Sequence, residues 1–175
     1  MSEPLTAADV VLAIALIVAC ITDLRSQKIY NALTFPLMLT GVGIWLVKGD
    51  VLFALTGLGA AFVLHFALFA LRVDRAGDAK LMMGVGACWG WVEMLEASLW
   101  AFLVFAPMGL VVLIATRRLS RFVAALRWTW LRVTTGAEIA GDRPEGTPLA
   151  KAPAIAIGVV IARLTQLIYL TPPAQ

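Results

Sequence analysis

The chain has 175 residues, of which 61% are hydrophobic and only 14% are charged, and its mean hydropathy is strongly positive. A soluble domain of this length does not bury so large an apolar fraction, so the composition excludes a soluble protein and predicts an integral membrane protein. Fourteen Lys and Arg residues against eleven Asp and Glu give a net charge of +3.

Six apolar segments are long enough, or nearly so, to cross a bilayer as helices of about 17 to 20 residues. They run continuously apolar, whereas strands that span a membrane alternate apolar with polar residues, so every span is predicted to be helical. The second and fourth segments are short, and their helices are expected to continue into polar flanks. The segments are Leu5–Thr22, Ala32–Val47, Val51–Leu71, Ala79–Val92, Ala97–Ala115 and Ala152–Leu170.

The predicted fold is therefore an all-α, polytopic membrane helix bundle, formed by a single domain over residues 1–175. The N-terminus lacks the basic region and the cleavage site of a secretory signal, so the first segment is interpreted as a retained span. Cys20 and Cys88 lie in apolar segments with no Cys or His at ligand spacing. We therefore expect neither a disulfide nor a metal site.

The longest loop, residues 116–151, divides into an amphipathic helix and a polar connector. Over Arg117–Val133, apolar residues recur at helical spacing against several arginines. This helix is expected to lie flat on the membrane, where Arg and Trp contact lipid headgroups, and we favour this interpretation over a nucleic-acid-binding patch. The connector, Gly136–Lys151, carries Gly and Pro and returns to the bilayer near Pro153.

The positive charges indicate the orientation. Twelve of the fourteen Lys and Arg residues lie in alternate loops on one side of the six spans, while Lys48 lies opposite and Arg163 lies inside the sixth span. Basic loops stay in the cytoplasm. The pattern predicts a multi-pass protein of the bacterial inner membrane with both termini in the periplasm, and it places Asp23 and Asp78 together at the cytoplasmic face.

These two aspartates carry the functional hypothesis, because acidic groups at the edge of the hydrocarbon are costly to ionise. Asp78 follows Gly77 at the predicted start of a helix. The alternative to a catalytic role is that it is the N-cap of this helix and accepts backbone N–H bonds. Asp23 ends a helix, where the alternative is an ion pair with Arg25 or Lys28. Two neighbouring carboxyl groups share a proton, so one is predicted to activate a water and the other to protonate a peptide carbonyl.

Two segments around these residues resemble the signature sequences of the type IV prepilin peptidases, which are membrane aspartic proteases. Residues 23–31, Asp-Leu-Arg-Ser-Gln-Lys-Ile-Tyr-Asn, are similar to the basic segment that follows the family's first aspartate, and residues 76–81, Ala-Gly-Asp-Ala-Lys-Leu, are similar to its Gly-x-Gly-Asp-x-Lys-Leu motif. Residues 153–158 also resemble the family's last span. The resemblance implies catalytic roles for Asp23 and Asp78, supporting roles for Gly77, Lys80 and Asn31, and no cofactor.

The chain departs from the family pattern at two positions: Arg75 stands in place of the first Gly of the motif, and Tyr30 in place of the Pro before Asn31. The larger members also have a cytosolic segment with paired cysteines for N-methylation, which is not found here. The chain is therefore similar to the short Tad-type enzymes. The implied partner is a Flp-type prepilin, whose basic leader is cut ahead of a hydrophobic helix near the inner boundary of the membrane.

Two other functions remain open from the residues alone. An intramembrane proton or ion carrier also uses membrane acids, although carriers usually hold them near the midplane within inverted repeats. A pilus-assembly scaffold that has lost peptidase activity would explain Arg75.

Several polar residues also have open roles. Lys80 either orients the substrate or extends toward the interface, and Asn31 is a candidate cap for the second span. His65 is expected to hydrogen-bond a neighbouring helix, and Asp74 to pair with Arg72 or Arg75. Arg163 is expected either to extend toward the membrane surface or to bind a buried partner, such as Gln166 or a substrate carboxylate.

Overall fold

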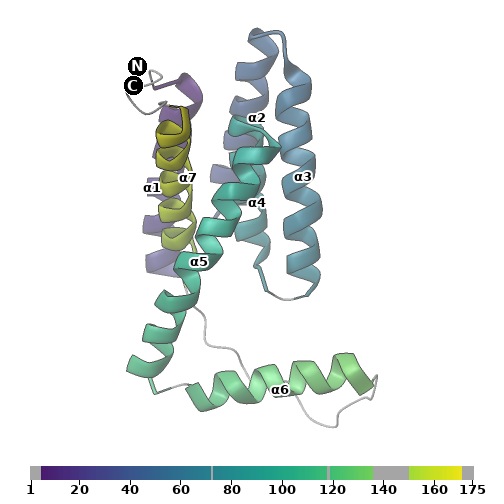
Figure 1. The fold of residues 1–175 in the computed structure, drawn as a ribbon, viewed down its shortest axis with the longest axis vertical. Coiled ribbons are helices and arrows are strands. Elements are labelled where there is room, and N and C mark those ends of the chain that lie inside the picture. Colours follow the sequence, from purple (N-terminus) through teal and green to yellow (C-terminus); the bar gives the residue numbers. More distant parts are fainter. Residues whose placement is uncertain (1–4, 72, 118, 136–149, 171–175) are drawn as a thin grey trace. The chain divides into compact units, whose positions relative to one another are not determined.

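The computed structural model describes residues 5–71, 73–117, 119–135 and 150–170. Every regular element in these ranges is an α-helix (Figure 1), which confirms the all-α prediction. The helices are α1 (Ala7–Ser26), α2 (Asn31–Val47), α3 (Val51–Ala70), α4 (Ala76–Trp89), α5 (Trp91–Ala115), α6 (Leu119–Thr135) and α7 (Ala152–Leu170).

Three of these helices, α1, α3 and α5, are long and apolar enough to cross a membrane. Helix α2 and the part of α7 up to Thr165 are apolar but shorter. The prediction of six membrane spans is therefore not confirmed as such. The boundary between the fourth and fifth segments is also corrected, because α5 begins at Trp91 instead of Ala97. Gly90, with a φ of 86°, ends α4, and α5 then carries Glu93 and Glu96 within its first two turns.

The chain divides into two compact units. The first comprises residues 1–104 and 150–175, and the second comprises residues 105–149, which include the end of α5 and all of α6. Helix α6 confirms a helix near the predicted Arg117–Val133, displaced by two residues at each end. Its place at the membrane surface stays a prediction. Most of the connector Gly136–Lys151 lies outside the described residues.

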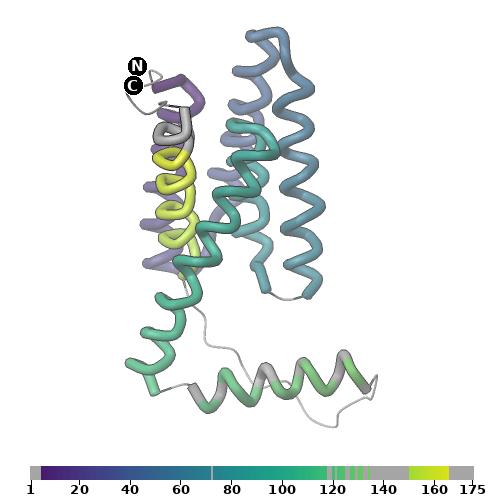
Figure 2. The backbone as a smooth tube through the Cα atoms, viewed as in Figure 1, coloured from purple at the N-terminus to yellow at the C-terminus, as the bar shows by residue number. Residues whose placement is uncertain are grey.

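Within the first unit, α4 packs against both α2 and α3, and α7 lies beside α1 (Figures 1 and 2). The contact of α3 with α4 is backbone to backbone. A Cβ added to Gly57 would lie 2.0 Å from the carbonyl oxygen of Gly86, and one added to Gly86 would lie 2.3 Å from that of Gly57. Small residues at such crossings let membrane helices approach closely. This crossing holds the end of α4 against α3, eight residues beyond Asp78.

Candidate active site

Asp23 lies in the last turn of α1 and is 2% exposed. Its Oδ2 accepts the backbone N–H groups of Lys151 and Ala152, at 2.7 and 2.9 Å. Because α7 begins at Ala152, the carboxyl group occupies the N-terminus of that helix, where free N–H groups and the helix dipole favour negative charge. The alternative ion pair with Arg25 or Lys28 is wrong, since both side chains are exposed and Asp23 turns inward to α7.

Asp78 lies in the first turn of α4 and is 4% exposed. Helix α4 begins at Ala76, so Arg75 is the N-cap and the interpretation of Asp78 as the cap is wrong. From the third helical position, Asp78 Oδ2 accepts the backbone N–H of Arg75 at 3.3 Å, which is the acidic half of a capping box. A Cβ on Gly77 would lie 3.1 Å from the Cβ of Ile29, so this glycine admits the α1–α2 loop.

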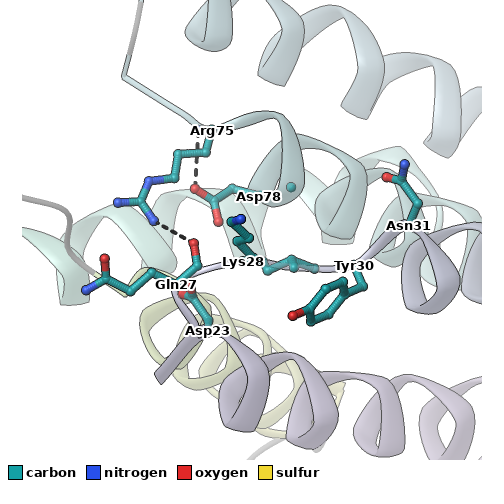
Figure 3. A pocket seen from close by; sticks show the side chains of 9 residues that line it. Asp23, Gln27, Lys28, Tyr30, Asn31, Arg75 and Asp78 are labelled. Atoms are coloured by element: carbon teal, nitrogen blue, oxygen red, sulfur yellow. Dashed lines mark hydrogen bonds between the residues drawn. The ribbon is translucent and has the colours of Figure 1, made fainter. Parts of the chain in front are cut away.

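Both aspartates line one pocket of about 360 Å³. Figure 3 shows Asp23 reaching it from α1 and Asp78 from the start of α4. The α1–α2 loop forms the remaining wall, and Gln27, with a φ of 52°, turns the chain out of α1. The structure thus brings into one pocket the two carboxyl groups that the sequence predicts to lie together. The lining residues are Asp23, Gln27, Lys28, Ile29, Tyr30, Asn31, Arg75, Gly77 and Asp78.

The predicted supporting residues Lys80 and Asn31 contact each other. Lys80 Nζ donates to Asn31 Oδ1 at 2.9 Å, and the ammonium group lies 5.3 Å from the ring centroid of Phe35. The alternative that Asn31 caps α2 is wrong, because the N-cap residue is Tyr30 and it makes no side-chain cap bond. The amide of Asn31 is engaged with Lys80 instead, and this pair joins the start of α2 to α4.

Arg75, which departs from the family motif, directs its side chain across the mouth of the pocket. Its Nη1 donates to the backbone oxygen of Gln27 at 3.3 Å (Figure 3). Its backbone N–H is the group that binds Asp78. The guanidinium group therefore connects the α1–α2 loop to the start of α4, while the contact with Asp78 needs only the main chain.

A buried polar cluster that the sequence did not reveal lies next to Asp78. Asp74 accepts His65 Nδ1–H at 2.5 Å on Oδ2 and Lys151 Nζ on Oδ1. His65 Nε2 and Ser98 Oγ are hydrogen-bonded at 3.0 Å, which confirms that His65 bonds to a neighbouring helix, α5. The expected pairing of Asp74 with Arg75 is wrong, since Asp74 points into the bundle, and the side chain of Arg72 lies outside the described residues.

Burial works to raise the pKa of Asp74, but the hydrogen bonds from His65 and Lys151 outweigh it and hold that pKa below its usual value. Ser98, His65 and Asp74 follow one another as in a serine hydrolase triad. The cavity beside them measures about 10 Å³, however, which is the space of one water and excludes a peptide. The cluster is therefore a structural neighbour of the aspartates and not a second hydrolytic site.

Arg163 has a partner that sequence reasoning missed. Its Nη2 donates to Asp9 Oδ2 at 2.9 Å, and Trp89 Nε1 donates to Asp9 Oδ1 at 2.8 Å. Asp9 lies 154 positions away in the first turn of α1, so no local pattern connects the two residues. Among the described residues, no group of three or more His, Cys, Asp or Glu side chains is arranged to hold a metal ion.

The sequence comparison decides the family. The model of the type IV leader peptidase family matches residues 10–110, which is more than half of the chain. The chain belongs to the type IV leader peptidase family. The match includes Asp23, Asp78 and all of α2 to α4, and it confirms the resemblance seen in the two signature segments. Membership supports a leader peptidase-type protease for prepilins, and together with the three long apolar helices it indicates a membrane protein. Comparison with curated proteins and with solved structures gives no match.

Proposed function

We propose that this type IV leader peptidase family member is an aspartic endopeptidase that removes the basic leader of Flp-type prepilins, with Asp23 and Asp78 as its catalytic residues. The observation that carries the proposal is that both carboxyl groups are buried and line the same pocket of about 360 Å³. Carboxyl groups that share a site divide one proton between them at neutral pH, which supplies a base and an acid together.

In the proposed reaction, the ionised member takes a proton from a water whose oxygen bonds to the scissile carbonyl carbon. The protonated member gives its proton to the carbonyl oxygen, and a tetrahedral intermediate results. When the intermediate collapses, the carbon–nitrogen bond breaks, the nitrogen receives the proton taken from the water, and the other carboxyl group recovers its own. The two aspartates titrate as a pair, so neither role belongs to one residue alone.

The hydrophobic helix of the prepilin has a place beside this pocket. An apolar groove of about 290 Å³ runs between α2, α3 and α4. Ala76, Ala79, Lys80 and Met83 of α4 line the groove, while Gly77 and Asp78 line the pocket from the opposite side of the first turn of α4. Asn31, which lines the pocket, binds Lys80, which lines the groove, so the two sites meet at this pair. An apolar helix held in the groove fits a cut just ahead of that helix. The remaining groove residues are Phe35, Met38, Phe62, Phe66 and Phe69.

The proposed orientation keeps the basic leader in the cytoplasm, with the pocket at the inner face of the cytoplasmic membrane and both termini in the periplasm. It rests on the distribution of Lys and Arg, because basic loops remain on the cytoplasmic side. The membrane lipid is the second expected partner, through the arginine-bearing helix α6.

The test is cleavage of a purified Flp-type prepilin in detergent, followed by sizing of the products. Asp23→Asn and Asp78→Asn are each expected to slow cleavage at least about 1000-fold, because each removes half of the acid–base pair. Asp50→Asn is the matched control: Asp50 is exposed and caps α3 through Phe53 N–H, a role that Asn performs equally well.

Cleavage that survives either active-site substitution would reject the aspartate pair. A scaffold would leave the prepilin intact even as wild-type protein, and it would support pilus assembly with both substitutions present. A proton carrier would also leave the prepilin intact, and it would acidify liposomes under a proton gradient in a manner that depends on the two aspartates.

A further inference from the structure

Lys151 is a buried cation at the start of α7. Its side chain is 7% exposed, its Nζ donates to Asp74 Oδ1, and the ammonium group lies 4.5 Å from the ring centroid of Phe102. Its own backbone N–H binds Asp23 at 2.7 Å. A buried ammonium group is costly unless it is paired and hydrogen-bonded. One residue therefore joins the last turn of α1 to the link between α3 and α4.

Asp74 and His65 hold the ammonium group in place. Asp74 lies in the short link that leads into α4, four positions before Asp78, and His65 on α3 binds its second oxygen at 2.5 Å. Lys151, Asp74, His65 and Asp78 all line the same small cavity of about 10 Å³. Asp78 thus lies between the pocket on one side and this cluster on the other.

We propose that Lys151 is a positioning residue for the aspartate pair: its backbone N–H fixes Asp23, and its ammonium group, held by Asp74 and His65, places a positive charge next to Asp78. This inference rests on the proposed function. A fixed cation favours ionisation of the carboxyl groups around it, so it sets the pH range in which the pair holds one proton. The charged or titratable groups around Asp78 are Asp23 on α1, Lys28 and Tyr30 in the α1–α2 loop, His65 on α3, Asp74 and Arg75 before α4, and Lys151 just before α7.

The informative variant is the double substitution Asp74→Asn with Lys151→Met. It removes both buried charges together, whereas either substitution alone would leave one charge buried without its partner. Methionine retains the backbone N–H that binds Asp23, so the variant tests the ammonium group specifically. Lys48→Met is the matched control, because Lys48 is exposed beyond α2 and stacks on Trp45, away from the pocket.

The double variant is expected to fold in detergent and to cleave the prepilin with a kcat about 10- to 100-fold below wild type, while KM stays within about twofold. The acidic limb of its kcat/KM profile is expected to move to higher pH by less than about one unit, because loss of the Lys151 cation, which favours ionisation of the carboxyl groups, outweighs loss of the Asp74 anion, which opposes it. Lys151→Arg, made in the wild-type protein, keeps the positive charge and is expected to show the same pH profile as wild type.

An unchanged pH profile in the double variant would overturn the inference, whether or not kcat falls, since a purely structural role moves no titration. If that variant does not fold, Lys151→Met alone decides in its place, because Asp74 keeps its hydrogen bond from His65. The profile should move in the same direction, and an unmoved profile overturns the inference. In both cases wild-type cleavage leaves the proposed function intact. Wild-type protein that does not cleave the prepilin would overturn both.

Discussion

Asp23 accepts the backbone N–H of Lys151 at 2.7 Å, although 128 positions separate the two residues. In its own helix, α1, the carboxyl group lies in the last turn, where negative charge opposes the helix dipole. At the N-terminus of α7 the same group meets N–H donors and the favourable end of a dipole. The position of one catalytic candidate thus depends on a helix that lies outside the region matched by the family, residues 10–110.

The apolar groove offers a test of where the prepilin helix binds. Phe66→Ala removes one aromatic wall of the groove and is expected to raise KM about 5- to 10-fold with kcat nearly unchanged, because the lost contact serves binding and not the chemical step. Val63→Ala is the control on the same helix, since Val63 is exposed and does not line the groove. Equal KM values for the two variants in steady-state cleavage assays would place the helix elsewhere.

The Asp74 cluster predicts a pH-dependent contribution to stability. The folded pKa of Asp74 lies below its ordinary value, so its stabilisation is complete above about pH 4 and is lost as the pH falls through the lower, folded pKa. Asp74→Asn should cost about 3 kcal/mol at pH 7, because it leaves Lys151 buried without its carboxylate partner. Unfolding in detergent between pH 3 and 7 measures this, and a wild-type-to-variant difference that does not shrink below pH 4 would contradict it.

The crossing of α3 and α4 predicts a sharp difference between two glycines of one helix. Gly57→Ala forces a methyl group against the backbone of Gly86 and should destabilise the protein by about 1 to 3 kcal/mol. Gly59→Ala meets no atom within 4 Å and should be neutral or slightly stabilising. Thermal unfolding of both variants in one detergent makes the comparison, and similar losses in the two would mean that the helices do not cross at Gly57.

Arg75→Gly restores the glycine of the family motif and tests the connection across the pocket. The backbone N–H that binds Asp78 survives, but the bond from Nη1 to the oxygen of Gln27 is lost. Amide hydrogen exchange over residues 27–30 is expected to become faster, with no change over α3. Arg25→Gln, at an exposed site near the end of α1, serves as the control. Unchanged exchange in the loop would show that Arg75 does not restrain it.

Continuous apolar runs were enough to predict an all-α membrane protein and the approximate ranges of its helices, because an apolar run of this length has few other stable forms in lipid. They failed at the boundary between α4 and α5. There, Gly90, which has a positive φ, ends α4. Helix α5 then begins with Glu93 and Glu96 in its first turns, and Glu96 accepts a hydrogen bond from the Thr165 hydroxyl at 2.5 Å. Apolar content alone cannot show such a break.

For the site, the sequence by itself was enough to single out Asp23 and Asp78 and to predict that they lie together, since the signature segments and the loop charges both depend on local residues. The tertiary structure decided the partners of the buried polar groups: Asp23 accepts N–H groups at the N-terminus of α7, Asp74 binds Lys151 and His65, and Arg163 binds Asp9. Each of these contacts joins separate helices, or a helix to an interhelical link. Helix packing alone brings such groups within hydrogen-bonding distance, and no spacing along the chain encodes it.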